Sequence, residues 1–416
     1  MKTNNTRLNF SLLTTTLTGL TLLSLTSGSA LAANWTITDL GALGAPGNLA
    51  FESRAYNINN AGQVAGRGIV FIDGVRQNHY VVWSNGTQID LGIRINSSLV
   101  DAAPINDAGQ VAGVIEDEGY RPFLWQAGVV TRLPVLPGLL TAGVASINAS
   151  GTVVGWNQVW RGGGQPRLAV RWEGGILTEL DTDWRPAVAI NDSGAIAISG
   201  GPSHVLTGGA TNVVEVPGHP STVALDLNNA GQVCGTTVDG HHAFLWQGGF
   251  GTLLPGFPSG VSAQSEAVAL NNLGHAVGWA ANNSGMNPPV LWRDGTLTSL
   301  NDLPEVQAAG WWLMAARDIN DHDQIVGIGS HGGLVTAFLL SPVTAPSPFS
   351  LTITRIGTNV VVSFPTEASF SYSVQSKPSL AETNWNLLAT LPGNGSTKSV
   401  TDPATNAARF YRVLVP

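Results

Sequence analysis

The sequence contains a single cysteine, Cys234, so no intramolecular disulfide can form. Charged residues make up 11 % of its 416 residues, against roughly 25 % in an average globular protein. Lysine occurs only as Lys2, Lys377 and Lys398, and residues 33–342 hold 12 Arg, no Lys and 24 Asp or Glu. Because phosphate backbones are bound by clustered positive charge, this composition argues against nucleic acid as a partner.

Motifs of catalysis and cofactor binding are also missing. There is no Gly-x-Ser-x-Gly elbow, no His-Glu-x-x-His, no phosphate-binding loop and no pair of cysteines. A single Asp in a turn supplies too few oxygens for calcium, so Asp107, Asp192 and Asp321 are expected to stabilise their own turns. We therefore expect no catalytic residue, no metal and no cofactor.

The first 32 residues have the features of a secretion signal. Lys2 and Arg7 form a basic start, the stretch from Phe10 to Thr26 is uncharged, and Ala30-Leu31-Ala32 provides a small-residue cleavage pattern. We expect cleavage after Ala32 and a secreted protein, extracellular or periplasmic. No other segment is long and apolar enough to cross a bilayer, so no membrane span is expected.

One unit recurs seven times. Its turn, Ile/Leu-Asn-x-x-Gly, is centred on Asn59, Asn106, Asn148, Asn191, Asn228, Asn271 and Asn320. These Asn residues are 37 to 49 residues apart, and in the last copy Asp323 replaces the Gly. Asn tolerates left-handed backbone and Gly adopts it freely, so the turn is expected to close a hairpin without strain.

Copies one to six continue after the turn with three more short strands, and copy seven with two. The strand after the turn resembles Gln-Val-Ala-Gly. The third strand ends in Trp83, Trp125, Trp172, Trp246 and Trp292, with Thr207 and Leu340 in copies four and seven. The fourth follows a Gly-containing turn. Four strands in about 43 residues are the size and pattern of one propeller blade.

The two ends of the array complement each other. Copy seven stops after its third strand, Thr336 to Leu340, whereas the segment Trp35 to Gly41 matches a fourth strand. The prediction is an all-β fold in which residues 33–342 form a seven-bladed β-propeller closed by the N-terminal strand. Such closure leaves no exposed edge between blades.

The tail is expected to be a separate domain. Residues 343–348 form a Pro-rich linker, and residues 349–416 contain six predicted strands, from Ser350, Asn359, Ser371, Trp385, Thr397 and Arg409 onward. This number of strands predicts an immunoglobulin or fibronectin III-like β-sandwich. Its Tyr372 to Ser376, Trp385 and Arg409 to Val413 resemble modules at the C-terminus of many bacterial secreted proteins, which implies an attachment or accessory role.

The repeat resembles a known family. His242-Ala243-Phe244-Leu245-Trp246, downstream of Ala230 to Gly235, is similar to the bacterial extracellular repeat named for its His-Ala-Phe tripeptide, or HAF repeat. The resemblance covers residues 34–342 and departs from the pattern in copies four and seven. It implies a secreted protein with a propeller-like fold and no agreed catalytic residues. Cys234 stands where other copies have Ala or Val, which predicts a small buried side chain.

The connections after strands two and four are long and varied, whereas those after strands one and three are short and uniform. In a four-strand meander the long connections all emerge on one face, where repeat proteins place recognition. Exposed Trp beside planar polar groups suits sugar rings. The candidate ligand-binding residues on this face are Trp160, Arg161, Asp183, Trp184, Arg185, Trp311 and Trp312.

The function expected from these features is non-catalytic binding or adhesion, with an extracellular glycan or protein as ligand. One alternative is a propeller-fold polysaccharide lyase or glycosidase, for which Glu266, Glu305 or Asp183 would supply acid and base groups. Another is a purely structural component of an envelope or matrix.

Overall fold

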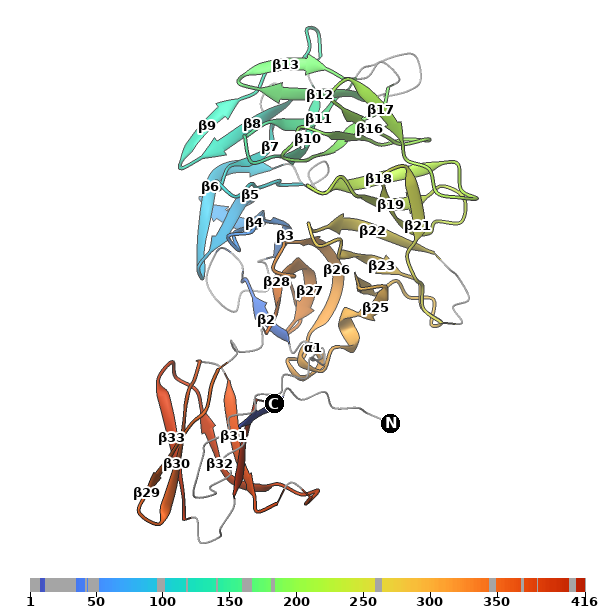
Figure 1. Ribbon diagram of the computed structural model, residues 1–416. Helices are drawn as coiled ribbons and strands as arrows, with labels where there is room; N and C mark the ends of the chain where they lie inside the picture. The colour runs from blue at the N-terminus through green and yellow to red at the C-terminus, as the bar shows by residue number, and fades with distance from the viewer. Residues whose placement is uncertain are drawn as a thin grey trace. The chain divides into compact units, whose positions relative to one another are not determined.

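The computed structural model (Figure 1) describes residues 8–11, 35–41, 43, 52–95, 102–116, 119–139, 141–158, 167–180, 184–258, 264–343, 349–367, 370–379, 381–403 and 409–415. The chain divides into two compact units, Trp35–Pro342 and a second made of Met1–Asn34 with Val343–Pro416. In these described ranges the only helices are η1 (Leu300–Asp302) and α1 (Pro304–Ala308). The expected all-β fold is confirmed. Neither helix is long and apolar enough to span a membrane.

The described part of the larger unit contains seven antiparallel sheets in chain order, six with four strands and one with three (Figure 1). Sheets 1 to 3 are formed by β3 (Ser53–Ile58), β4 (Val64–Ile72), β5 (Val75–Ser84) and β6 (Thr87–Ile95); by β7 (Val111–Glu116), β8 (Tyr120–Gln126) and β9 (Val129–Arg132); and by β10 (Ala142–Ile147), β11 (Val153–Gln158), β12 (Arg167–Glu173) and β13 (Ile176–Glu179).

Sheets 4 to 6 follow the same meander. They are formed by β14 (Ala187–Ile190), β15 (Ile196–Ile198), β16 (His204–Thr207) and β17 (Ala210–Val213); by β18 (Thr222–Leu227), β19 (Val233–Thr237), β20 (Ala243–Gln247) and β21 (Phe250–Leu253); and by β22 (Ser265–Leu270), β23 (Ala276–Ala280), β24 (Pro289–Arg293) and β25 (Thr296–Ser299).

Sheet 7 combines segments from both ends of the unit. Its order is β2-β28-β27-β26, with β2 (Trp35–Asp39) antiparallel to β28 (Leu334–Pro342), followed by β27 (Ile325–His331) and β26 (Trp312–Ile319). The pairing continues beyond β2, because the backbone N–H of Leu40 donates to the carbonyl of Ala337 at 3.0 Å. The N-terminal segment therefore occupies the fourth-strand position of the last sheet.

The glycine that ends the Gln-Val-Ala-Gly pattern is explained by a close backbone approach. In six sheets the register of the first strand shifts by one residue, as between Ala55 and Asn57 in β3. Such a bulge bends the strand locally. A Cβ on Gly66 would collide with the backbone carbonyl of Arg54, and one on Gly278 with that of Glu266. A larger residue at either position would push the first two strands apart.

The repeated turn closes a hairpin, as expected. The left-handed backbone is carried by the fourth residue, as in Gly62 with φ of 75°, and not by the Asn. In the last copy Asp323 adopts φ of 57° at this position. The Asn acts through its side chain: Oδ1 of Asn59 accepts the backbone N–H of Gln63 at 2.8 Å. The other six turns contain the same bond.

The third-strand Trp residues pack between neighbouring sheets. Trp172 and Trp292 are almost fully buried, and their Nε1 atoms donate to the carbonyls of Pro134 and Pro255 in the preceding connection at 2.6 and 2.8 Å. The register corrects the sequence alignment in copy four. Trp172 faces the first residue of its second strand, and the residue in that place in sheet 4 is Leu206, not Thr207.

The smaller unit contains the six strands predicted for the tail, and each begins within two residues of its predicted start. One sheet has the order β1 (Leu8–Ser11), β34 (Phe410–Leu414), β31 (Ser371–Lys377), β32 (Asn386–Pro392), and the other β29 (Thr352–Ile356), β30 (Asn359–Pro365), β33 (Thr397–Pro403). A shared core includes Val362, Phe364, Tyr372 and Tyr411. β1 lies in the predicted signal segment, whose other residues, like most of the predicted linker 343–348, fall outside the described ranges.

Candidate functional site

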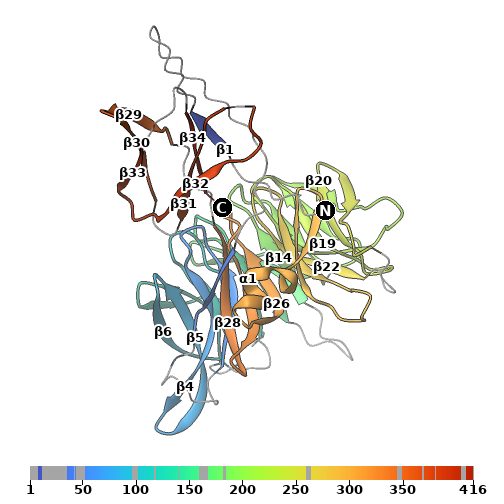
Figure 2. The same cartoon turned by 90° about the horizontal axis from the view of Figure 1, so that it is seen from below.

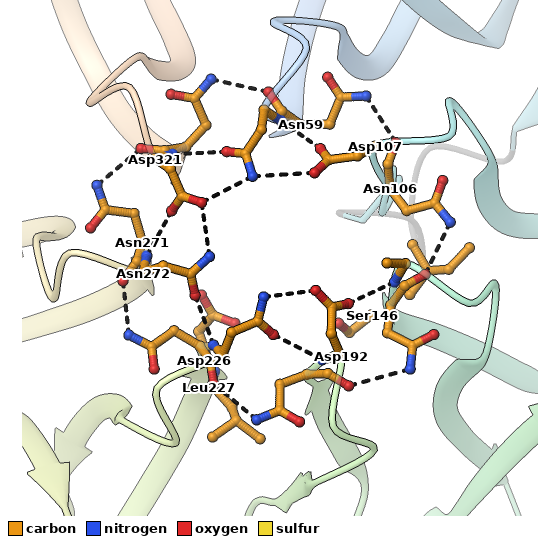
Figure 3. Close-up of a pocket in the computed structure, with 18 of the residues that line it drawn as sticks. Asn59, Asn106, Asp107, Ser146, Asp192, Asp226, Leu227, Asn271, Asn272 and Asp321 are labelled. Carbon is orange, nitrogen blue, oxygen red and sulfur yellow. Dashed lines mark hydrogen bonds between the residues drawn. The ribbon is translucent and has the colours of Figure 1, made fainter.

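The seven repeated turns meet at one end of the sheets, around a hollow lined by all of them (Figure 3). Here the side chain of each repeat Asn reaches the next sheet: Nδ2 of Asn59 donates to the carbonyl of Asn106 at 2.8 Å. The same bond links every following pair, at 2.8–3.3 Å. Asn320 then donates to the carbonyl of Asn59 at 3.0 Å, so the seven bonds form a circuit.

A second set of bonds joins the residues that follow each Asn. The backbone N–H of Asn60 donates to Asp107, that of Ala149 to Asp192 and that of Asn272 to Asp321, at 2.7–2.8 Å. We expected these three Asp residues to stabilise their own turns. That expectation was wrong, because each carboxylate accepts its bond from the neighbouring sheet.

Two further carboxylates lie just before the turns. Asp318 accepts the backbone N–H of Ile58 at 2.8 Å, and Asp226 that of Leu270 at 2.9 Å, so each joins its sheet to the next. Burial raises the pKa of Asp226 to about 6. Burial, and then the negative charge of Asp226, raises the pKa of Asp318 to about 7. Loss of hydration of the charged form is the main physical cause in both cases.

The groups lining this hollow are therefore engaged mainly with one another. Within the described ranges, no group of three or more His, Cys, Asp or Glu residues is arranged to hold a metal ion. We assign the ring of turns to holding the sheets together, and we place the candidate binding site at their opposite end.

That opposite end carries a cleft of about 370 Å³ between sheets 5, 6 and 7. Three connections form it: the segment after β21, the loop between β23 and β24, and the segment containing η1 and α1 that leads into β26. Figure 2 shows α1 beside β26. These are connections after second and fourth strands, the long and varied loops in which recognition is expected.

The cleft combines apolar and polar side chains. Trp312 and Met286 expose 51 % and 46 % of their surface, and Phe257 is half-buried against the core of sheet 6. Asn283 and Asp302 contribute exposed polar groups. An aromatic surface beside amide and carboxylate groups can stack on the apolar face of a sugar and hydrogen-bond its hydroxyls.

One buried side chain fixes this geometry. Nδ2 of Asn301 donates to the carbonyl of Leu313 at 2.9 Å, and its Oδ1 accepts the N–H of Leu313 at 2.8 Å. Gln307 on α1 donates to the carbonyl of Asn301 at 3.1 Å. The segment before Trp312 is thus tied to the start of β26, which positions the indole at the cleft.

The adjacent Trp residues have different environments. Trp311 is buried, stacks on His331 with ring centroids 4.6 Å apart and meets Phe338 edge-on. We expected both to lie on the ligand surface. For Trp311 this was wrong, because its buried ring packs against side chains of β27 and β28 in sheet 7. Trp312 lines the cleft.

Of the remaining candidates, those that the structure describes, Trp184 and Arg185, do not line this cleft. Trp160, Arg161 and Asp183 lie outside the described residues. Trp184 is half-buried with φ of 61°. Arg185 donates from Nη1 to the carbonyl of Pro202 at 2.8 Å and lines a separate pocket beside sheet 4.

Several cleft residues were not named as candidates from the sequence. Phe257, Met286 and Asp302 lie in connections of variable length, and that variability is the only sequence signal that could have found them. The catalytic candidates Glu266 and Glu305 are not among the described residues that line the cleft. Cys234 is buried as expected, and burial raises the pKa of its thiol well above the usual range.

No known protein family and no curated protein matches this sequence. Among solved structures, the chain resembles an oligogalacturonate lyase in complex with manganese, at 10 % identity and a TM-score of 0.47, covering 82 % of this chain and 99 % of that one. It also resembles a puromycin-hydrolyzing peptidase of Mycobacterium tuberculosis, at 13 % identity and a TM-score of 0.44. That match covers 77 % of this chain and 59 % of the peptidase. A third similar structure is the β-propeller domain of the Trilobed protease from Pyrococcus furiosus, which has an open velcro topology. Its identity is 11 % and its TM-score 0.35, and the match covers 61 % of this chain and 97 % of that domain. At these scores the likenesses carry no argument about activity.

Proposed function

We propose that this chain is a secreted, non-catalytic binding protein that holds an extracellular glycan in the cleft around Trp312. The observation that carries the proposal is the half-exposed indole of Trp312, set among amide and carboxylate groups in a cleft of about 370 Å³. That volume is within the range of small-ligand pockets, roughly 300–1,000 Å³.

The proposal includes the fold: the seven sheets are the blades of a β-propeller closed by β2, and the smaller unit is a β-sandwich. Two features support closure, namely the pairing of β2 with β28 and the bond from Asn320 to Asn59. In the mature chain the leader is removed after Ala32. Membership of the His-Ala-Phe repeat family stays a prediction from the motifs.

The make-up of the cleft favours binding over hydrolysis. Most glycosidases place two carboxyl groups on either side of the scissile bond. Asp302 is the only carboxylate among the described residues that line this cleft. A single carboxylate can orient a sugar hydroxyl, but it does not supply both an acid and a base.

The test is a glycan microarray followed by calorimetric titration of the hits, using the chain that begins at Ala33. Trp312→Ala is expected to weaken binding at least tenfold, because the stacking surface is lost. Phe250→Ala is the matched control, since Phe250 is an aromatic residue, 62 % exposed, beside the turn at the other end of its sheet.

Equal affinity of Trp312→Ala and wild type would refute the cleft as the binding site. Release of sugar fragments from a bound glycan, abolished in Asp302→Asn, would show a hydrolase instead.

A further inference from the structure

The third strand of sheet 4 differs from most others at the position that Trp holds in five sheets. Leu206 occupies the position held by Trp in sheets 1, 2, 3, 5 and 6 and by the fully buried Leu340 in sheet 7. Two residues earlier, His204 faces Ile198 where Phe244 faces Gly235 in sheet 5. This second position holds Phe in sheets 2, 5 and 7 and Val in sheets 1, 3 and 6. Sheet 4 is therefore set apart from most sheets by the smaller side chain of Leu206 at the Trp position.

In five of the other sheets the position of Leu206 is occupied by an indole ring. The indole of Trp172 belongs to a core that includes Leu133 of the preceding connection, and that of Trp292 packs with Leu254 in the same way. Both indoles are at most 2 % exposed. The space between a third strand and the preceding sheet therefore accommodates an indole in this repeat.

In sheet 4 that space is open. Leu206 is only partly buried, and with Leu180 of the preceding connection it lines a pocket of about 350 Å³. Thr211 and Val213 on β17 complete the wall, and they pair in register with Leu206 and His204. Figure 1 shows β16 and β17 next to sheet 3. Replacement of a buried ring by a smaller side chain leaves a cavity when the backbone does not collapse onto it.

One side of this pocket is cationic. The guanidinium of Arg185 is held by its 2.8 Å bond to the carbonyl of Pro202, and its stem packs closely against Gly200. An oriented guanidinium attracts the face of an aromatic ring. Pockets that combine apolar walls with a few placed polar groups are typical sites for small ligands.

We propose that the pocket between Leu180 and Leu206 is a binding site for a small planar aromatic ligand of indole size. The ligand takes the place that the indoles of Trp172 and Trp292 hold in sheets 3 and 6. Arg185 contacts its face, and His204 provides a polar group at its edge. This site is separate from the cleft around Trp312.

The test uses 5-fluoroindole as the probe, with ¹⁹F NMR titration of the chain that begins at Ala33. We expect saturable binding with one site per chain, and glucose at the same concentration is expected not to compete. Leu206→Trp fills the pocket with the side chain of the other sheets and is expected to weaken binding at least tenfold. His204→Phe is the second filling variant, should Leu206→Trp fail to fold.

Trp312→Ala is the matched control and is expected to leave indole affinity unchanged, whatever its effect on glycan binding. Trp172→Leu creates the same vacancy in sheet 3 and is expected to add a second binding site. The proposal is overturned if 5-fluoroindole shows no saturable binding at millimolar concentration, or if the folded filling variants bind it as tightly as wild type.

Discussion

Removal of the N-terminal strand tests whether β2 completes the last sheet. The comparison is between a chain that begins at Ala33 and one that begins at Ala42. β2 contributes Trp35, which is 5 % exposed, and Ile37, which is half-buried. Asp39 at its end accepts a hydrogen bond from Thr336 at 2.7 Å and pairs with His331 at 3.0 Å.

The expected loss follows from these contacts. Truncating a buried Trp costs about 3–5 kcal/mol, the half-buried Ile about 1 kcal/mol, and the hydrogen bonds of Asp39 about 1 kcal/mol together, because they are partly exposed. A loss of about 5–7 kcal/mol compares with a net stability of roughly 5–15 kcal/mol for a typical domain. It also leaves the edge of β28 unpaired, which favours association between molecules.

The assays are urea denaturation and size-exclusion chromatography at equal protein concentration. The short chain is expected to unfold at much lower urea and to lose monomer. Thr36→Ala with Thr38→Ala is the matched control, because both side chains lie on the exposed face of β2, and it should cost less than about 1 kcal/mol. Equal midpoints and equal monomer fractions for the two chain lengths would refute closure by β2.

Three further predictions concern single side chains. Asn320→Asp keeps the Oδ1 acceptor of its turn but loses the donor to Asn59. The free energy of unfolding measured with urea should therefore fall by about 1–3 kcal/mol. The same change at exposed Asn394 should leave it unchanged, and equal losses would contradict the circuit of Asn bonds between the sheets. The raised pKa of Asp318, about 7 against an ordinary 3.8, means that the folded protein binds more protons than the unfolded one between those values. The contribution of Asp318 to the stability of the folded protein therefore falls as pH rises from about 4 to about 7. The melting temperature of wild type minus that of Asp318→Asn should decrease from pH 4 to pH 8, and a constant difference would be evidence against this environment. Trp311→Ala should lower the free energy of unfolding by about 3–5 kcal/mol because its ring is buried. Trp312→Ala should lower it by less than about 1 kcal/mol. Similar losses would mean that the environments of the two residues are misassigned.

The sequence by itself determined the local elements of this protein. The repeated Asn-x-x-Gly turn, the strand that follows it and the spare strand at Trp35 are local patterns, and the sheets form where those patterns predict them. The face that carries the variable loops followed from strand order alone, and Trp312 was named on it. The tail strands were likewise readable, because each is a short alternating segment bounded by turn residues.

Only the tertiary structure decided what those elements touch. The Nδ2 of each repeat Asn and the carboxylates of Asp107 and Asp321 bond to a neighbouring sheet about 40 residues or more away in the chain, and local patterns do not encode such partners. Trp311 and Trp312 are neighbours of one type, yet the backbone after α1 turns one inward and the other outward. The pocket at Leu206 arose from register, because a shift of one residue decides which side chain faces the preceding sheet.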